Sequence, residues 1–200
     1  MKLILASQSP RRVELLQLLG LPFQIIPSEI DENIFEDCPK KRVEKLAFEK
    51  NKKVGVSLEK QGQFCVISAD TVVYLNGQIL EKPIDLADAK KMLLSLGGKT
   101  HQVYTGVTIA TYGTTNNQKF SWVEETLVTF APMIEELLIK YLQTGDSLDK
   151  SGGYGIQSMS KAFISSIEGC PNSVMGLPLQ KVHANLKNLF YNSNLYELFN

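Results

Sequence analysis

Short apolar runs that predict strands alternate along this chain with longer stretches in which apolar residues recur at helical spacing. Residues 3–6 form the first apolar run, and the leucine-rich stretch over residues 13–19 predicts a helix behind it. Ser9 suits the N-cap of this helix, Pro10 its first position and Gly20 the residue after its end. The chain is therefore expected to begin with a strand, a short loop and a helix.

A long helix is predicted over residues 39–58, because apolar residues recur on one of its faces. That face carries Val43, Leu46, Ala47 and Val54. Lys50 falls on the same face, since it lies seven residues after the first of these positions. Its side chain either extends along the edge of the core towards solvent or points into a cleft where it meets phosphate.

Residues 64–67 are a continuous apolar run, which indicates a strand covered on both faces. The strand continues to residue 75, and Asn76-Gly77 predicts a hairpin that returns over residues 78–80. Asp70 interrupts this apolar segment. A buried carboxylate is costly without a partner, so Asp70 is either a hydrogen-bonded structural residue or a metal ligand or base in a site. We favour the site.

The second half of the chain continues the same alternation of strands and helices. Asp85 predicts the N-cap of a helix that ends at residues 97–98. Residues 101–109 alternate well enough to predict a half-exposed strand, and a turn at residues 114–117 leads to another strand. The remaining predictions are strands near 120–130 and 162–167, a helix over 132–142, and a last helix that starts within residues 176–179 and runs to about residue 190. His101 has no metal-ligand pattern around it, so we interpret it as a structural histidine.

The loop over residues 7–12 is the first candidate for chemistry. Arg11 and Arg12 stand in the first turn of the predicted helix, where a cation opposes the helix dipole by about 0.3–1 kcal/mol each. Free N–H groups, the hydroxyls of Ser7 and Ser9 and the two guanidinium groups together favour a phosphate-binding site. The alternative is a capped helix whose arginines lie in solvent.

Other segments supply further candidates. Residues 28–32 form an acidic loop that is either solvated or, in a protein that holds polyphosphate, a source of metal ligands such as Glu32. Lys82 precedes a proline, so its backbone is expected to be extended at the end of the hairpin. The glycine-rich loop over residues 149–157 allows close backbone approach to a ligand and ends at Gln157, whose amide can both donate and accept.

Composition limits the classes of function. The 200 residues suffice for one domain or for two lobes that share a cleft, and the 21 basic and 21 acidic residues cancel. A neutral chain argues against broad capture of nucleic acid or an anionic membrane, so any anion site must be local. The three isolated cysteines, the absence of a secretory or spanning segment and the lack of a P-loop favour a cytoplasmic protein that is not a phosphotransferase.

A set of stretches, taken in order, resembles the Maf family of nucleoside triphosphate pyrophosphatases. They are residues 6–12, 31–32, 46–50, 69–73, 81–83, 101–106, 149–157 and 176–179. The resemblance implies an α/β fold like that of inosine triphosphate pyrophosphatase, with a mixed, strongly bent central sheet, flanking helices and a cleft between two lobes of a single domain over residues 1–200. It also implies a homodimer, and the hydrophobic end of the chain at residues 191–200 is a candidate subunit surface.

The resemblance also implies an activity and roles for residues. The chain looks like the subgroup that hydrolyses dTTP and UTP to the monophosphate and pyrophosphate. The physiological substrate is either these ordinary nucleotides or modified pyrimidine nucleotides that are removed as house-cleaning. Asp70 is expected to be the proton acceptor, with Lys50 and Lys82 around the phosphates, which Ser7, Ser9, Arg11 and Arg12 would hold. Asp70 and Glu32 are expected to bind Mg²⁺ or Mn²⁺.

Substrate discrimination is assigned by the resemblance to Arg12, Thr71 and Gln157. The chemical hypothesis is that Gln157 pairs with the O4/N3–H edge of uracil or thymine, which cytosine does not reproduce. Ser158 stands where the family usually has glycine, next to this residue. The alternative function is a non-catalytic nucleotide sensor that acts on a cell-division or septum partner.

Overall fold

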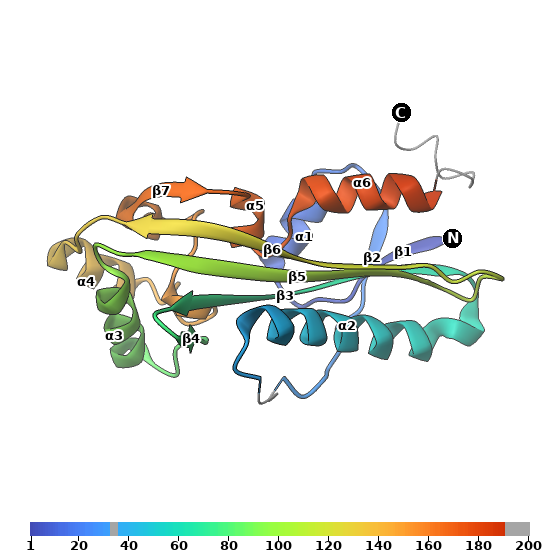
Figure 1. The fold of residues 1–200 in the computed structure, drawn as a ribbon, viewed down its shortest axis with the longest axis horizontal. Helices are drawn as coiled ribbons and strands as arrows, with labels where there is room; N and C mark the ends of the chain where they lie inside the picture. Colours follow the sequence, from blue (N-terminus) through green and yellow to red (C-terminus); the bar gives the residue numbers. More distant parts are fainter. Residues whose placement is uncertain (33–35, 191–200) are drawn as a thin grey trace. The chain divides into compact units, whose positions relative to one another are not determined.

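The computed structural model describes residues 1–32 and 36–190 of the chain (Figure 1). The helices are α1 (Pro10–Gln17), α2 (Pro39–Leu58), α3 (Leu86–Leu96), α4 (Glu135–Gln143), α5 (Pro171–Val174) and α6 (Leu179–Phe190). The strands are β1 (Lys2–Leu5), β2 (Phe23–Ile25), β3 (Phe64–Leu75), β4 (Gln78–Leu80), β5 (Thr100–Tyr112), β6 (Lys119–Phe130) and β7 (Ile164–Glu168). Short 3₁₀ helices occur at η1 (Glu59–Gln61), η2 (Ser151–Gly153) and η3 (Met159–Phe163).

The strands form one seven-stranded sheet in the order β2-β1-β3-β5-β6-β7, with β4 paired to β3. Strand β1 runs parallel to both β2 and β3, whereas the β3–β4 and β6–β7 pairs are antiparallel. The predicted mixed α/β class is therefore confirmed. The predicted bend of the sheet, the cleft and the description as a single domain stay predictions.

The chain divides into two compact units. The first contains residues 1–70, 105–123 and 176–200, and the second contains residues 71–104 and 124–175. Strands β3, β5 and β6 are long enough to contribute residues to both units. None of the helices in the described ranges combines the length and the apolar character that a lipid bilayer requires of a spanning helix.

In the first unit, helix α2 covers one face of the sheet, and α1 and α6 lie on the other side (Figure 1). The fully buried side chain of Asn51 joins α2 to two strands, because its amide donates to the carbonyls of Val66 at 2.7 Å and Thr108 at 3.0 Å. The hydroxyl of Tyr112 donates to the same side chain at 2.8 Å. Gly106 permits α2 to lie this close to β5, because a Cβ at position 106 would lie only 2.3 Å from the carbonyl oxygen of Val43.

In the second unit, apolar side chains from α3, α4 and the strands form one core cluster. Its aromatic members pack edge to face, with the rings of Phe130 and Tyr154 4.8 Å apart and those of Tyr141 and Phe163 5.7 Å apart. His101 lies fully buried in this cluster, and its Nε2 is 2.6 Å from the hydroxyl of Tyr154. The prediction of a structural histidine is therefore confirmed.

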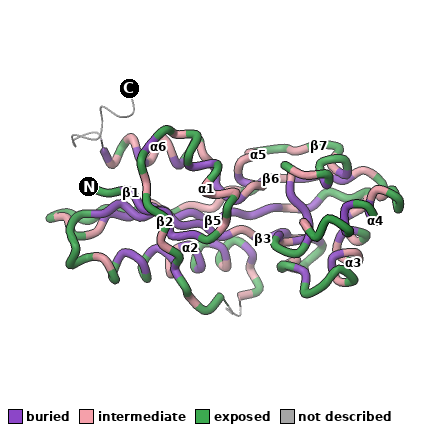
Figure 2. Tube along the Cα trace, turned by 180° about the vertical axis from the view of Figure 1, so that it is seen from behind, coloured by how far each residue is buried: buried purple, intermediate pink, exposed green. Residues whose placement is uncertain are grey.

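Most predicted elements form at the expected positions, including helix α2 over its full predicted range. The prediction of a half-exposed β5 is wrong, because nearly all of this strand is buried (Figure 2). Its polar positions are mainly threonines whose hydroxyls find partners, such as Thr108 with Ser121 at 3.0 Å and Thr111 with the backbone of Gln118 at 2.8 Å. Helix α4 also begins three residues later than predicted. The predicted subunit surface at residues 191–200 lies outside the described residues.

Replacing Asn51 with alanine should destabilise the protein. The substitution leaves two buried carbonyl groups and the Tyr112 hydroxyl without their partner, which we expect to lower the free energy of unfolding by about 2–4 kcal/mol. Urea denaturation measures the change. Asn185→Ala is the matched control, because Asn185 donates to Lys181 within its own helix at an exposed position. A loss for Asn51→Ala no larger than that of the control would contradict the argument.

Acidification should destabilise the protein through His101. Burial lowers the pKa of His101 to about 4, from an unfolded value near 6.5. The unfolded chain therefore takes up this proton first as the pH falls, so the stability that neutral His101 provides is complete above pH 6.5 and is lost towards pH 4.

Between pH 7 and pH 5 the free energy of unfolding should fall by about 2 kcal/mol more in the wild type than in His101→Gln. Denaturation at the two pH values checks this difference. His183→Gln controls for the loss of an imidazole and should keep the wild-type response. An identical pH response in His101→Gln and the wild type would refute the assignment.

Candidate functional site

The loop between β1 and α1 places its polar side chains around the hydroxyl of Ser7. The Ser7 side chain is buried, and its Oγ accepts from the backbone N–H of Ser9 at 3.1 Å and from Nη1 of Arg12 at 3.3 Å. The Nε of Arg12 donates to the carbonyl of Gly176 at 2.9 Å. Ser9 occupies the predicted N-cap position of α1, but its side chain makes no capping hydrogen bond. The loop thus fixes one arginine firmly at the start of the helix.

Lys50 of α2 lies between two carboxylates in the first unit. Its Nζ is 2.7 Å from Oδ1 of Asp70 and 2.8 Å from Oε1 of Glu32. Lys50 and Asp70 are both buried, with 6% and 7% of their surfaces exposed, whereas the Glu32 side chain is more than half exposed. Lys50 therefore points inward from the apolar face of α2, and its contact with phosphate in a cleft stays a prediction.

Arg12 belongs to the same electrostatic environment. Burial lowers the pKa of its guanidinium, and the neighbouring charge of Arg11 acts in the same direction. The carboxylates of Asp70 and Glu32 act to raise that pKa, but the net pKa stays below the ordinary arginine value. Arginine nevertheless keeps its charge at neutral pH. The first unit thus joins Ser7 to Arg12 by a hydrogen bond and Lys50 to Glu32 and Asp70 by ion pairs, and the pKa of Arg12 responds to both carboxylates.

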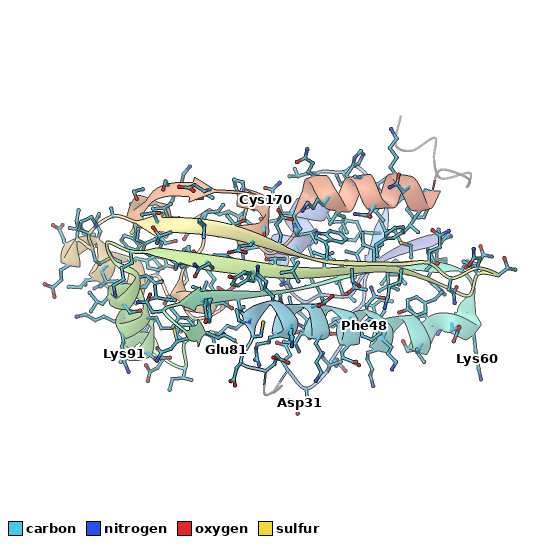
Figure 3. The ribbon with its side chains drawn as sticks, in the orientation of Figure 1. Asp31, Phe48, Lys60, Glu81, Lys91 and Cys170 are labelled. Carbon is cyan, nitrogen blue, oxygen red and sulfur yellow. The ribbon has the colours of Figure 1, made fainter. Side chains whose placement is uncertain are left out.

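Three of the other predicted site residues belong to the second unit, whereas Ser9 and Arg11 lie in the first. Thr71 follows Asp70 directly along β3, Lys82 is exposed after β4, and Gln157 is exposed at the end of the glycine-rich loop. Glu81 precedes Lys82, and Asp31 lies in the loop below α2 (Figure 3). The convergence of these second-unit residues with the first-unit group stays a prediction.

The glycine-rich loop is joined to the strand and hairpin segments that carry Thr71 and Lys82. The hydroxyl of Ser151 donates to the carbonyl of Thr71 at 3.1 Å, and the N–H of Gly152 donates to the carbonyl of Glu81 at 3.0 Å. Gly152 has φ +69°, and a Cβ there would lie 3.0 Å from the side chain of Val73. The glycine-rich loop therefore holds the backbone at Thr71 and next to Lys82, and it carries Gln157 at its own end.

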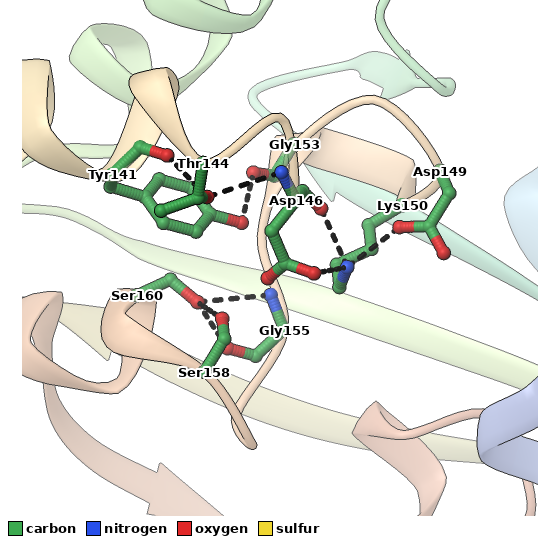
Figure 4. Close-up of polar contacts among 9 residues, drawn as sticks. All are labelled: Tyr141, Thr144, Asp146, Asp149, Lys150, Gly153, Gly155, Ser158 and Ser160. Carbon is green, nitrogen blue, oxygen red and sulfur yellow. Dashed lines mark hydrogen bonds and ion pairs between the residues drawn. The ribbon is translucent and has the colours of Figure 1, made fainter.

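Sequence reasoning missed the side chains that hold the glycine-rich loop and the turn that follows it. They are Tyr141, Asp146, Asp149, Lys150, Ser158 and Ser160 (Figure 4). The spacing of Lys150, four residues after Asp146 and directly after Asp149, is the signal that could have predicted an ion cluster. The serines carry no such signal, because their partners are backbone groups and each other.

The donors available for a cation are carboxylate oxygens. Across the described ranges, no group of three or more His, Cys, Asp or Glu side chains gathers as a metal site. Oxygens of Asp70 and Glu32 nevertheless converge on one cationic group, the ammonium of Lys50. Hard oxygen donors are those that Mg²⁺ and Mn²⁺ prefer, so this pair fits such an ion when phosphate oxygens or water complete its coordination.

Comparison with known proteins identifies relatives along most of the chain. A dTTP/UTP pyrophosphatase of Thermosipho africanus is 47% identical over 182 residues, which cover 91% of this chain and 90% of the relative. A dTTP/UTP pyrophosphatase of Clostridium perfringens is 42% identical over 190 residues, which cover 94% of this chain and 97% of the relative.

A solved structure, the nucleoside-triphosphatase / dITP/XTP pyrophosphatase of Mycobacterium abscessus, is 11% identical and covers 97% of this chain and all of its own, with a TM-score of 0.41. The family assignment rests instead on the sequence relationships. Residues 2–189 match the family described as Maf-like protein. Because this match spans nearly the whole chain and includes both groups of candidate residues, the protein belongs to the Maf family.

Proposed function

We propose that this protein hydrolyses dTTP and UTP to the nucleoside monophosphate and pyrophosphate, with water attacking the α-phosphorus. The proposal is supported by the names of the relatives and carried by one observation, the buried Lys50 ammonium between the carboxylates of Asp70 and Glu32. Arg12 adds a second cationic group whose pKa responds to both carboxylates. A neutral chain thus concentrates the charges that a triphosphate reaction requires in one small region.

The cationic residues hold the phosphate chain in this mechanism. A triphosphate repels a nucleophile, so its charge must be neutralised and the leaving pyrophosphate stabilised. Arg12 is already fixed by Ser7 and Gly176, so its guanidinium loses little further conformational freedom when it binds phosphate. Lys50 can exchange a carboxylate for a phosphate oxygen, while Arg11, Ser9 and Lys82 complete the contacts.

Asp70 is the proton acceptor in the proposed reaction. Its carboxylate is buried on β3, a rigid strand in the middle of the sheet order, and its Oδ1 contacts Lys50. A general base must stay in place within hydrogen-bond reach of the attacking water, and the strand and the ion pair provide that placement. Glu32 is more exposed and can adjust its position towards a bound nucleotide.

Asp70 and Glu32 are also the residues that would hold a divalent metal. Their oxygens suit Mg²⁺ or Mn²⁺, which when bound would neutralise phosphate charge and make water more acidic. Lys50 contacts one oxygen of each carboxylate, so it would share these two side chains with a bound ion. Lys50 thereby maintains the charge balance of the two carboxylates before the nucleotide arrives.

Selection of the base is assigned to the second unit. Gln157 can donate to O4 and accept from N3–H of uracil or thymine, and cytosine presents the opposite pattern at this edge. Thr71 stands next to Asp70 in the chain and is joined to the glycine-rich loop through Ser151. The names of the relatives describe an enzyme, which favours catalysis over a purely sensory role in cell division. A homodimer remains part of the proposal.

Replacing Asp70 with asparagine should abolish turnover. The amide keeps the size of the carboxylate and can still accept from Lys50, but it cannot take a proton, so kcat for dTTP should fall by at least about a hundredfold. Pyrophosphate release with Mg²⁺ or Mn²⁺ measures the effect, and thermal unfolding checks that the variant is folded. The first product also tests the reaction, since orthophosphate would indicate attack at the γ-phosphorus.

Asp85→Asn is the matched control for this substitution. Asp85 caps α3 by accepting from the N–H of Asp88, and asparagine is an equally good cap, so the control should keep wild-type turnover. If Asp70→Asn also kept near-wild-type turnover, Asp70 would be removed from the mechanism.

Replacing Gln157 with alanine should weaken discrimination between bases. We expect the ratio of kcat/KM for UTP to that for CTP to fall by about tenfold or more, because the variant no longer offers a matching hydrogen-bond pattern. The measurement is kcat/KM for UTP, dTTP and CTP in each protein. Gln143→Ala, at the exposed end of α4, is the control. Unchanged ratios in Gln157→Ala would count against base recognition by this residue.

A further inference from the structure

The turn that carries Gln157 is closed by the buried hydroxyl of Ser160 (Figure 4). This hydroxyl donates to the carbonyl of Gly155 and accepts from the N–H of the same residue at 3.2 Å. It also lies 2.8 Å from the hydroxyl of Ser158. Gly155 and Ser158 stand on either side of Gln157 in the chain, so these contacts hold the backbone before and after it.

The same turn is anchored to an ion cluster around the buried Lys150 side chain. The Nζ of Lys150 lies 2.5 Å from Oδ1 of Asp146 and 2.6 Å from Oδ1 of Asp149, and the Lys150 side chain is 8% exposed. A Cβ at Gly155 would lie 3.0 Å from Cε of Lys150, so the lysine chain packs directly against the turn. The hydroxyl of Tyr141 donates to the carbonyl of Gly153 at 3.0 Å. The turn is therefore fixed from several sides within the second unit.

Ser158 donates its hydroxyl proton to the Ser160 oxygen, because the one proton of Ser160 goes to the Gly155 carbonyl. Burial acts to raise the pKa of Asp146, but Lys150 outweighs burial and the pKa lies below its ordinary value. The backbone of Ser158 has φ −106° and ψ −170°, an extended conformation that any residue adopts. The contribution of this residue to the turn is therefore its hydroxyl, and removing the hydroxyl leaves the backbone unstrained.

We propose that Ser158 is a positioning residue for base selection: its hydroxyl, paired with Ser160, holds the turn in the conformation that presents Gln157 to the base. This inference rests on the proposed function of Gln157. A carboxamide that is already oriented distinguishes two hydrogen-bond patterns better than one that must be ordered on binding, since a mobile amide can turn over and suit either base. Ser7, Arg12 and Lys50, which the proposal assigns to phosphate, belong to the first unit, whereas Ser158 and Ser160 belong to the second.

Ser158→Ala tests the proposal. We expect the ratio of kcat/KM for UTP to that for CTP to fall by about three- to tenfold, through a higher KM for UTP, while kcat for UTP changes by less than about twofold. Ser158→Thr keeps a hydroxyl and should restore most of the ratio. Ser165→Ala is the matched control, because Ser165 lies on β7 of the same unit and donates to the Thr129 carbonyl on β6, and it should leave the ratio unchanged.

A double-mutant cycle with Gln157→Ala separates positioning from a general structural role. If Ser158 acts through Gln157, then Ser158→Ala should change the ratio in the wild-type background and produce no further change in the Gln157→Ala background. Equal changes in both backgrounds, or an unchanged ratio in Ser158→Ala, would overturn the inference. If Gln157→Ala lowers the ratio and Ser158→Ala does not, the inference fails while the proposed function stands. If the wild type hydrolyses neither dTTP nor UTP, both fail.

Discussion

The contact between Lys50 and two carboxylates is the constraint on which the rest of the first unit depends. A buried ammonium is tolerated only when it is paired, and removing one partner from a buried ion pair costs about 3–5 kcal/mol. Lys50 meets Asp70 because α2 lies flat on the sheet, and that contact requires Gly106 and the hydrogen bonds of Asn51. The same contacts that pack α2 on the sheet therefore also place the Lys50 ammonium beside the Asp70 carboxylate.

This arrangement also explains how a chain with no net charge can bind a highly charged ligand. The cations are not spread over a surface, and Arg12 and Lys50 come from separate helices to the same pair of carboxylates. Before a nucleotide binds, the carboxylates neutralise the cations and reduce the cost of their burial. In the proposed function, bound phosphate would give Arg12 and Lys50 a second anionic partner, and Asp70 and Glu32 would then be the residues that hold a divalent ion. The carboxylates therefore contribute both to folding and to the proposed chemistry.

The sequence predicted this region well, because its signals are local. The apolar face of α2 and the single carboxylate in an apolar strand place Lys50 and Asp70 without knowledge of the fold. It predicted β5 less well, because a threonine that hydrogen-bonds in the core cannot be distinguished in sequence from one in solvent. The Ser158–Ser160 pair could not be predicted, since its contacts depend on a turn whose shape is set by α4 and Lys150.

The roles proposed for the two units place different demands on their side chains. Phosphate binding tolerates small shifts, because charge–charge attraction falls slowly with distance, and charged side chains on helix and strand suffice for it. Base selection depends on the direction of a hydrogen bond, which weakens steeply when the angle is poor. A loop is normally too mobile for that task. The loop before Gln157 is instead held by Tyr141, Lys150 and Ser160, so its backbone gains the rigidity that a helix or strand would otherwise supply.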